Sequence, residues 1–385
     1  MKDIISDKVK NIPPSGIRKF FDLILSMEDV ISLGVGEPDF VTPWHIRDAA
    51  IYSLEQGYTS YTSNSGLLEL RELITQRIKD DYKVKYNPVN EVLITVGVSE
   101  ALDLAMRAIL NPDDEVIIPE PSYVSYKSCV IFAGGKPVVI PTNASTGFKI
   151  KPEQIEQTIT EKTKAILLSY PSNPTGATMN REELSKISEV VKRYELIVIA
   201  DEIYKLLTYD DEPVCFASLP GMKERTILLD GFSKAYAMTG WRIGYAAGNS
   251  EIIGAMTRIH QYTMLCASII SQRAAIQALR NSDKAVEEMR NEYNQRRRLI
   301  VKGLNEIGLE CTMPGGAFYV FPSIKRTGLS SEGFAEKLLR EQKVAVVPGT
   351  AFGECGEGYI RCSYATSMAK IEKALEKMGE FCDQL

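Results

Sequence analysis

The chain has 385 residues, of which 44% are hydrophobic and 25% are charged, and its formal net charge at pH 7 is −5. These ordinary proportions predict a folded protein with a substantial core and exclude an intrinsically disordered chain. The acidic balance argues against a nucleic-acid-binding protein, because such proteins usually carry a basic surface. No apolar run approaches the roughly 20 residues that a membrane span needs, so we expect neither nucleic acid nor a membrane as a partner.

The cysteines and the first residues indicate the compartment. Seven cysteines are scattered through the chain, and none forms a C-x-x-C pair. An odd, dispersed set is typical of reduced thiols in a cytoplasmic protein and not of a disulfide framework or a zinc site. The first ten residues, MKDIISDKVK, lack the apolar stretch of a signal peptide. We therefore expect a cytoplasmic protein.

Short apolar runs rich in β-branched residues alternate with helical patterns through the first two thirds of the chain. The runs predict strands at 92–96, 115–118, 137–140, 164–168, 196–199, 226–229 and 242–246. The patterns between them predict helices at 100–110, 181–194 and 251–263. Strands that are apolar throughout are typical of a sheet with helices on both faces, which predicts an α/β fold. In such folds ligands bind at the carboxyl ends of the strands.

The last third of the chain has a different pattern. The predicted elements are a charged helix at 283–307, strand-like residues at 315–321, an amphipathic helix, strands at 344–347 and 359–364, and a final helix. This order predicts a smaller α+β domain. We expect three parts: an N-terminal arm with part of the small domain at 1–40, a large domain at 41–280 and a small C-terminal domain at 281–385.

Several common catalytic motifs are absent from the sequence. It contains no G-x-x-x-x-G-K-[ST] and no G-x-S-x-G, and the G-x-G start at Gly34 and Gly36 has Asp39 where the dinucleotide fingerprint needs a third glycine. Its only histidines are His45 and His260. A histidine triad or a histidine-rich metal site is therefore not expected, and we expect no bound metal. The chain must use other side chains or a cofactor.

Four polar clusters follow or precede the predicted strands. They are Y-P-S-N-P-T-G at 170–176, D-E-I-Y at 201–204, S-K at 233–234 with T-G-W-R at 239–242, and G-V-S-E at 97–100. Each alone has a simpler interpretation, as a turn, a helix N-cap or a solvated lysine. All four together, in this order and at strand ends, favour a functional site.

These clusters resemble those of the class I and II, fold-type I aminotransferases that depend on pyridoxal phosphate. The matching segments are 32–40, 61–66, 170–176, 200–204, 232–245, 314–319 and 359–365. They span nearly the whole chain and look closest to the prokaryotic aspartate and aromatic branch and to acetyl-diaminopimelate aminotransferases. The resemblance implies a mixed, mostly parallel seven-stranded sheet between helices in a large cofactor-binding domain, with a smaller α+β domain beside it.

The resemblance also assigns the residues at the cofactor ring. Lys234 would hold pyridoxal phosphate as a Schiff base and would shuttle the substrate proton. Asp201 would keep the ring nitrogen protonated, which lets the ring take up the electron pair left on the substrate. Asn173 and Tyr204 would hydrogen-bond the ring oxygen. A free lysine, with a pKa of about 10.4, is a poor base at neutral pH, so desolvation or a nearby cation must lower this pKa.

The cofactor phosphate needs donors and positive charge. The resemblance places five residues around it: Val98, Ser99, Glu100, Ser233 and Arg242. The first three begin a predicted helix, whose N–H groups and dipole attract an anion. Gly231 is a departure, because many members of the family carry a hydroxyl residue there.

The remaining assignments concern the substrate and the neighbouring subunit. Arg361 would bind the substrate α-carboxylate with its planar guanidinium, together with Asn173 and the backbone of Gly36. Tyr123 would stack on the cofactor ring, although it is also compatible with a core aromatic. Tyr61 would reach the phosphate of a second subunit, which implies a homodimer with shared active sites. Its simpler interpretation is an exposed loop tyrosine.

The function that this resemblance implies is transfer of the α-amino group of an amino acid to a keto acid, with 2-oxoglutarate as the expected acceptor. The alternative is β-elimination, decarboxylation or cyclopropane formation with the same cofactor residues. A cofactor-binding transcription regulator is disfavoured by the acidic pI of about 5.5 and by the short arm before residue 16, where the resemblance begins. Aspartate, aromatic amino acids, alanine and N-acetyl-diaminopimelate stay open as substrates.

Overall fold

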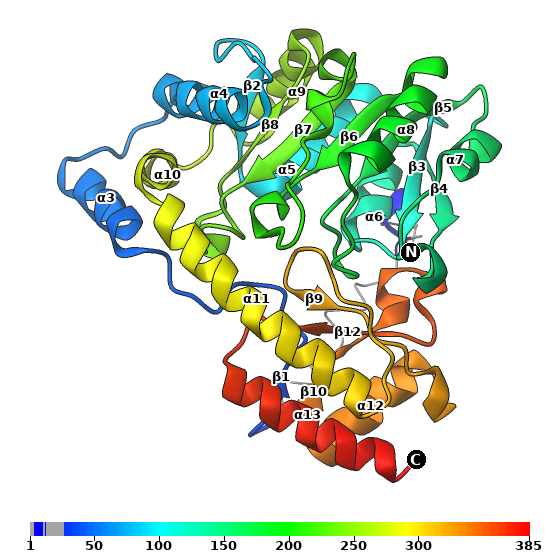
Figure 1. Cartoon of the computed structure of the whole chain (residues 1–385). Coiled ribbons are helices and arrows are strands. Elements are labelled where there is room, and N and C mark those ends of the chain that lie inside the picture. Colours follow the sequence, from blue (N-terminus) through cyan, green and yellow to red (C-terminus); the bar gives the residue numbers. More distant parts are fainter. Residues whose placement is uncertain (1–3, 11, 13–26) are drawn as a thin grey trace.

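The structure, a computed structural model, describes residues 4–10, 12 and 27–385. Figure 1 shows a large sheet with helices packed around it and a smaller C-terminal group of helices and short strands beneath. The expected N-terminal arm and the start of the family resemblance lie partly outside the described residues. Within them, no helix combines the length and the hydropathy needed to cross a bilayer.

The large sheet has seven strands in the order β2-β8-β7-β6-β5-β3-β4. Their bounds are β2 Val92–Thr95, β3 Glu115–Glu120, β4 Lys136–Pro141, β5 Thr163–Leu168, β6 Ile197–Asp201, β7 Thr226–Gly231 and β8 Gly244–Ala247. The five strands from β7 to β4 run parallel, and β8 is antiparallel to both of its neighbours. The predicted seven-stranded, mostly parallel sheet is confirmed.

Two of the predicted strands differ from the observed ones. The expectation that all seven are buried on both faces is wrong for β4, whose Val139 is 37% exposed. Strands β4 and β2 are the two edges of the sheet, but β2 is buried throughout, whereas helices leave part of β4 uncovered. The strand expected from 242 begins at Gly244, because Arg242 has a left-handed φ of +50° and ends a 3-10 turn, Thr239–Trp241.

Helices cover both faces of the sheet. Among the described residues up to 281, the α-helices are α1 Asp7–Lys10, α3 Trp44–Glu55, α4 Leu68–Tyr82, α5 Gly97–Ile109, α6 Ser125–Phe132, α7 Pro152–Thr158, α8 Arg181–Arg193, α9 Ser250–Thr263 and α10 Ile269–Asn281. Alternate strand residues enter different cores, as the two-residue period of a strand requires. Leu93 and Ile118 pack with α5, α6 and α9, whereas Ile117 and Val198 pack with α7 and α8.

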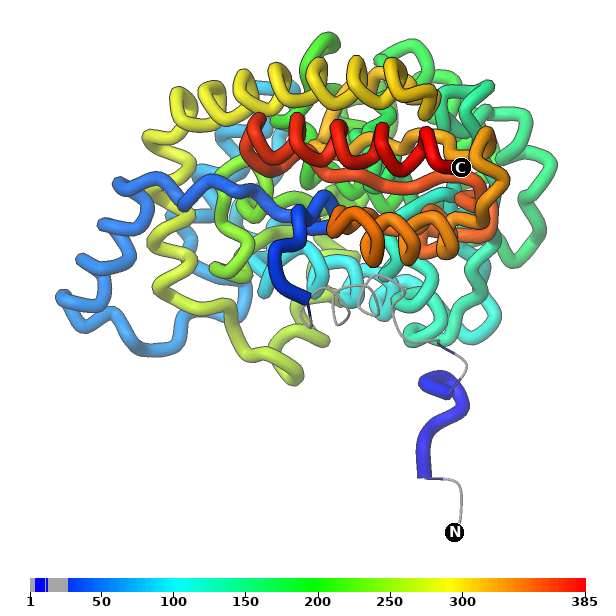
Figure 2. Tube along the Cα trace, turned by 90° about the horizontal axis from the view of Figure 1, so that it is seen from below, coloured from blue at the N-terminus to red at the C-terminus, as the bar shows by residue number. Residues whose placement is uncertain are grey.

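The C-terminal part contains the long helix α11 and two small sheets. Its elements are α11 Asp283–Glu306, β9 Tyr319–Val320, α12 Ser331–Gln342, β10 Val344–Ala345, β11 Val347–Pro348, β12 Ile360–Ser363 and α13 Met368–Asp383. Strands β11, β12 and β9 form an antiparallel sheet, and β10 pairs in parallel with β1, Ile31–Ser32. Helices α11 and α13 lie side by side (Figure 2).

The single strand expected at 344–347 is wrong, because the chain there forms β10 and then β11 in different sheets. Val344–Ala345 pairs with residues near the N-terminus, and Val347–Pro348 pairs with β12. The strand expected at 315–321 is reduced to Tyr319–Val320, since Ala317 has a left-handed φ of +57° and breaks the extended backbone.

The C-terminal core also includes residues of the large-sheet part. Phe318 and Tyr319 share one cluster of buried side chains with Leu33, Tyr204 and Ala237. Leu33 follows β1, and Tyr204 follows β6. The carboxyl ends of the large sheet therefore face the C-terminal core directly.

Replacing a buried aromatic of this core should lower stability strongly. Phe334 on α12 is fully buried and packs edge-to-face on Phe381, with ring centres 5.3 Å apart. We expect Phe334→Ala to reduce the free energy of unfolding by about 3–5 kcal/mol, measured by urea denaturation. Phe132→Ala, at a side chain that is 45% exposed, is the matched control and should cost much less. Equal losses in the two variants would contradict this description of the core.

Candidate active site

Lys234 lies in the segment after β7, at the carboxyl end of the parallel strands. Its Nζ donates a 2.7 Å hydrogen bond to Gly36 O and lies 5.7 Å from the ring centres of both Tyr204 and Phe318. Among the described residues, no carboxylate lies within ion-pair distance of this amine. Burial, together with the nearby Arg361 charge, lowers the pKa of Lys234 to about 8. A neutral amine is therefore accessible near neutral pH.

Asp201 is the last residue of β6, and its carboxylate is buried. The Tyr126 hydroxyl donates a 2.8 Å hydrogen bond to Asp201 Oδ2, and the Ile203 N–H donates a 3.3 Å bond to Oδ1. Burial raises the pKa of Asp201 to about 6, although these hydrogen bonds and the Lys234 charge act in the opposite direction. A cation facing this carboxylate would stabilise its charged form, and a protonated ring nitrogen is such a group.

Arg361, on β12, lies buried between the two parts of the fold. Its Nη1 donates a 3.0 Å hydrogen bond to Asn173 Oδ1, and its Nη2 donates a 2.6 Å bond to Gly34 O. Its Nε has no hydrogen-bond partner among the described residues. A buried guanidinium without an acidic partner is costly in isolation, and this one is therefore suited to receive a carboxylate from a ligand.

The first turn of α5 meets the turn around Arg242. Gly97 begins the helix with a left-handed φ of +75°, and a Cβ on it would lie 2.8 Å from an Nη atom of Arg242. The exposed Arg242 side chain also donates a 3.1 Å hydrogen bond to Thr239 O. The N–H groups of Val98 and Ser99 belong to the first turn, where no helical partner exists. Together these groups offer donors and positive charge to an anion.

The glycine at position 231 is explained by close packing. Strands β7 and β8 pair Gly231 with Gly244, and a Cβ on Gly231 would lie 2.8 Å from Gly244 Cα and 3.3 Å from Val98 Cγ2. A Cβ on Gly244 would lie 2.8 Å from Val98 N. The two glycines thus let the start of α5 lie directly against the sheet, and they leave no room for a hydroxyl side chain at 231. Ser233, buried just before Lys234, remains as the hydroxyl residue of this segment.

The Glu100 carboxylate is turned away from the anion-binding turn. It accepts a 2.5 Å hydrogen bond from Val96 N and lies 2.6 Å from Nδ1 of His260, which is fully buried on α9. Glu100 is also the fourth residue of α5, beyond the N–H groups that a helix leaves without partners. The side chain thus fixes the shape of the turn.

Tyr123 and Tyr61 occupy different surroundings. Tyr123 is half-buried, with its ring edge-to-face on Tyr126 at 5.6 Å. Tyr61 is 82% exposed, and no hydrogen bond or ring contact joins it to the other predicted residues within the described part of the chain. The structure therefore brings Tyr123 to the site of its own chain and leaves Tyr61 on the surface.

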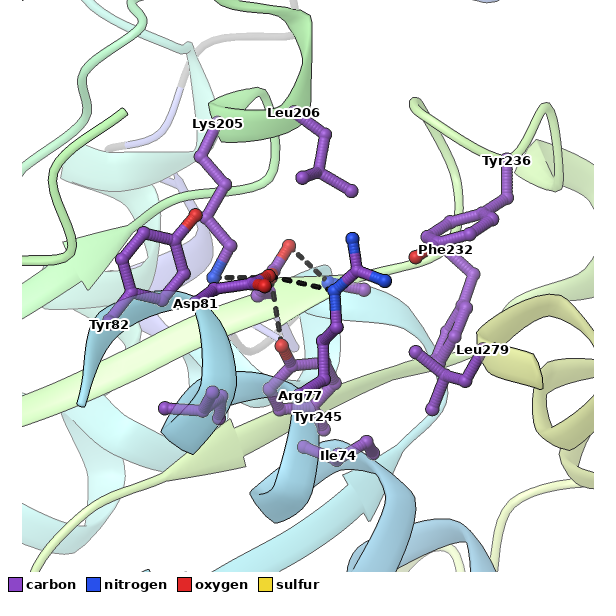
Figure 3. A pocket seen from close by; sticks show the side chains of 13 residues that line it. Ile74, Arg77, Asp81, Tyr82, Lys205, Leu206, Phe232, Tyr236, Tyr245 and Leu279 are labelled. Carbon is purple, nitrogen blue, oxygen red and sulfur yellow. Dashed lines mark hydrogen bonds and ion pairs between the residues drawn. The ribbon is translucent and has the colours of Figure 1, made fainter. Parts of the chain in front are cut away.

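A second buried lysine lies behind the site. Lys205 Nζ lies 2.9 Å from Asp230 Oδ2 and 3.5 Å from Glu202 Oε2, and Tyr245 donates a 2.8 Å hydrogen bond to the same Asp230 oxygen. Figure 3 shows Lys205 and Tyr82 at one side of a cavity of about 30 Å³, which holds roughly two water molecules. Burial alone would lower the pKa of Lys205, but the surrounding acidic groups, Asp230 foremost, together outweigh this effect and raise it well above its usual value.

Two tyrosines of this region carry no role in the sequence analysis. Tyr126 hydrogen-bonds Asp201, and the Tyr319 hydroxyl lies 2.7 Å from that of Tyr204. Both are buried aromatics on elements that also build the core. The only available signal was that Tyr319 belongs to P-G-G-A-F-Y, a segment that resembles the family. Tyr126 had no such signal.

Comparison with known proteins agrees with this geometry. Residues 28–378 match the family Aminotransferase class I and II. The chain is 58% identical over 381 residues to YugH of Bacillus subtilis, a protein named as an aminotransferase, and the match covers 99% of both proteins. It is 48% identical over 377 residues to an aspartate aminotransferase of Pyrococcus abyssi, with 97% of both covered. The aromatic aminotransferase structure from Pyrococcus horikoshii matches with a TM-score of 0.91 and 45% identity, over 96% of this chain and 99% of that one.

The chain belongs to the class I and II aminotransferases, and it is a pyridoxal-phosphate-dependent enzyme of fold type I. The residues present fit that cofactor. Asp201 is a buried carboxylate with no ion-pair partner among the described residues, which suits a protonated ring nitrogen. Gly97 approaches Arg242 so closely that a Cβ would fill the turn that offers donors to a phosphate.

The lowered pKa of Lys234 predicts how its covalent reaction with the cofactor depends on pH. Attack on an aldehyde needs the neutral amine, so the rate of covalent capture by the cofactor-free enzyme should rise with pH and reach half its maximum near pH 8. Stopped-flow absorbance after mixing with pyridoxal phosphate measures this rate. A midpoint near the ordinary lysine value of about 10.4 would contradict the geometry around the amine.

Removing the Tyr126 hydroxyl should change the acidity of Asp201. That hydroxyl stabilises the charged carboxylate, so Tyr126→Phe should raise the Asp201 pKa above about 6 in the cofactor-free enzyme, and above the wild-type value with the cofactor bound. The acidic limb of the kcat/KM profile should then move to higher pH. Tyr86→Phe is the control, since its buried hydroxyl has no partner within the described chain. An unchanged limb in Tyr126→Phe would show that this hydrogen bond does not control Asp201.

Proposed function

We propose that this enzyme transfers the α-amino group of aspartate or an aromatic amino acid to 2-oxoglutarate. The observation that carries the proposal is Arg361, a buried guanidinium with an unpartnered Nε, in a site that also contains the low-pKa amine of Lys234. Both half-reactions need the same two features, because amino acid and keto acid share a carboxylate beside the reacting carbon. The names of the aspartate and aromatic aminotransferases similar to this chain support the choice of donors.

We propose the following roles at the ring. Lys234 carries the cofactor covalently and moves the substrate proton, and Asp201 faces the ring nitrogen. Tyr204 and Asn173 hydrogen-bond the ring oxygen, and Tyr123 lies on the ring face. When bound, pyridoxal phosphate supplies an electron sink for the pair left at the substrate α-carbon. The burial of Asp201 supports its role, because a buried carboxylate stays charged only beside a cation.

We propose that the phosphate is bound by the first turn of α5 and the turns after β7. Val98 and Ser99 donate backbone N–H groups, and Ser233 and Arg242 supply a hydroxyl and a positive charge. Glu100 contributes to the same site indirectly, because its carboxylate accepts a hydrogen bond from Val96 N and so fixes the first turn of α5. For the substrate, Arg361 and Asn173 bind the carboxylate, and Gly36 approaches it with its backbone.

We propose that the enzyme is a homodimer with shared active sites. Tyr61 is 82% exposed and Tyr262 is 84% exposed, so both side chains are available to contact a second subunit. In a dimer, Tyr61 of one subunit would reach the phosphate of the other. We also propose a cytoplasmic location, supported by seven cysteines without a disulfide.

The three-part division of the chain remains part of the proposal. The pairing of β1 with β10 supports joining residues up to 40 to the small domain, and the cluster shared by Leu33 and the C-terminal side chains supports the same grouping. We therefore keep a large cofactor-binding domain at 41–280 and a small domain built from 281–385 with part of 1–40.

A half-reaction screen tests the proposed donors. The cofactor-loaded enzyme is mixed with single amino acids, and the loss of its visible absorbance is followed, then its return on adding 2-oxoglutarate. Aspartate or an aromatic amino acid should give the fastest loss, and 2-oxoglutarate should restore the spectrum. Release of pyruvate and ammonia from cystathionine, with no amino-group exchange for any donor, would instead support the β-lyase alternative.

Two substitutions test the proposed catalytic residues. Lys234→Ala should abolish turnover while phosphate contacts still bind the cofactor, and Asp201→Ala should fold but lose activity by at least about 100-fold. Turnover measured with 2-oxoglutarate and cofactor retention after gel filtration separate the two effects. Normal turnover in either variant would overturn the assignment of that residue.

A further inference from the structure

The Tyr319 hydroxyl meets the Tyr204 hydroxyl inside the protein. Tyr319 lies on β9 in the C-terminal part, and Tyr204 follows β6 of the large sheet, 115 residues earlier. Their oxygens are 2.7 Å apart, a normal distance for a hydrogen bond between hydroxyls, and both side chains are buried. Each phenol has one proton, so one of the two hydroxyls accepts while the other donates.

Tyr319 also reaches the carbonyl that holds the Lys234 amine. Its hydroxyl lies 3.3 Å from Gly36 O, which accepts the 2.7 Å bond from Lys234 Nζ. A Cβ on Gly36 would lie only 2.6 Å from the Tyr319 hydroxyl oxygen. Glycine at position 36 is therefore what allows the hydroxyl of Tyr319 to occupy this place between Gly36 and Tyr204.

The ring of Tyr319 packs against the guanidinium of Arg361. The Arg361 guanidinium lies over the Tyr319 ring, 4.5 Å from its centre, while its edge is held by Asn173 Oδ1 and Gly34 O. The Phe352 ring also lies against the guanidinium, with its centre 4.9 Å away. Two hydrogen bonds at the edge and these two rings fix the plane of the guanidinium. A fixed plane matters for bidentate binding of a carboxylate, and a cation over an aromatic face is itself favourable.

We propose that Tyr319 is a positioning residue for transamination, whose hydroxyl orients the Tyr204 hydroxyl and whose ring holds Arg361 flat for the substrate carboxylate. This inference rests on the proposed roles of Tyr204 and Arg361. It assigns to one side chain the support of both the cofactor-facing and the substrate-facing groups.

The proton count sets the direction of the hydrogen bonds. If Tyr204 donates its single proton to the ring oxygen, its own oxygen is free to accept from Tyr319. Of the two acceptors near Tyr319, Tyr204 at 2.7 Å is better placed than Gly36 O at 3.3 Å. A hydroxyl that accepts one hydrogen bond becomes a stronger donor of the next. Tyr319 therefore strengthens the bond that Tyr204 gives.

Tyr319→Phe removes the hydroxyl and keeps the ring under Arg361. We expect kcat to fall about 3- to 10-fold with KM for the amino acid within about twofold, because one hydrogen bond is lost and the carboxylate site is intact. The pH midpoint of the cofactor's visible absorbance change should also rise by roughly half a unit, since weaker donation to the ring oxygen disfavours the deprotonated form. A purely structural role would not move that midpoint.

Tyr319→Leu removes the ring as well as the hydroxyl. Comparing it with Tyr319→Phe should separate the effect of the ring on Arg361 from the effect of the hydroxyl on Tyr204. We expect a KM for the amino acid about threefold to tenfold above that of Tyr319→Phe, because Arg361 loses the nearer of its two aromatic rings and keeps only Phe352. Tyr364→Phe is the matched control: its buried hydroxyl donates a 2.9 Å bond to Ala317 O, away from Tyr204. That variant should keep the wild-type midpoint and KM, and urea denaturation should show that all variants fold.

Tyr204→Phe completes the experiment. In a Tyr204→Phe background, adding Tyr319→Phe should produce no further change in the midpoint, because the hydroxyl acts through Tyr204. If Tyr204→Phe changes the midpoint but Tyr319→Phe does not, the inference about Tyr319 is overturned and the proposed function stands. If Tyr204→Phe and Arg361→Lys both behave like wild type, the proposed site assignments fail and the inference falls with them.

Discussion

The site depends on removing one lysine amine from water without giving it an acidic partner. Two lysines near the carboxyl ends of β6 and β7 have buried amines, and the structure treats them in opposite ways. Lys205 faces Asp230 and Glu202, so its charge is compensated and its pKa is raised. Lys234 has a carbonyl, two aromatic rings and the Arg361 charge around it, and its pKa falls to about 8. Only the second arrangement gives a reactive amine at neutral pH.

The fold makes this arrangement possible by joining two cores at the strand ends. Parallel strands bring Asp201 and the segment of Lys234 together at the carboxyl ends of the strands. The C-terminal part packs over these strand ends with Tyr319 and Arg361. The amine is thereby shielded from much of the solvent, and Gly36 is held where its carbonyl accepts from Lys234. The same closure buries Arg361 with an unpartnered N–H, a cost that a bound carboxylate would offset.

Features that depend on local sequence patterns can be predicted from the sequence, whereas features that depend on long-range contacts cannot. Apolar runs predict the seven strands, because a strand covered by helices on both faces needs apolar residues throughout. The partial exposure of strand β4 and the division into β10 and β11 are missed, since tertiary contacts decide both. Motifs predict Lys234, Asp201 and Arg361. Tyr126 is missed because a buried tyrosine near a strand is also typical of a core, and the packing reason for Gly231 appears only when α5 lies on the sheet.

Locating the covalent attachment of the cofactor tests the central claim most directly. The enzyme loaded with pyridoxal phosphate is reduced with borohydride, digested and analysed by mass spectrometry to find the modified lysine. The account predicts a pyridoxyl group on Lys234 alone, because a reactive fraction of its amine is neutral near pH 8 while the paired amine of Lys205 stays charged. Modification of Lys205 or of an exposed lysine, with Lys234 unmodified, would contradict it.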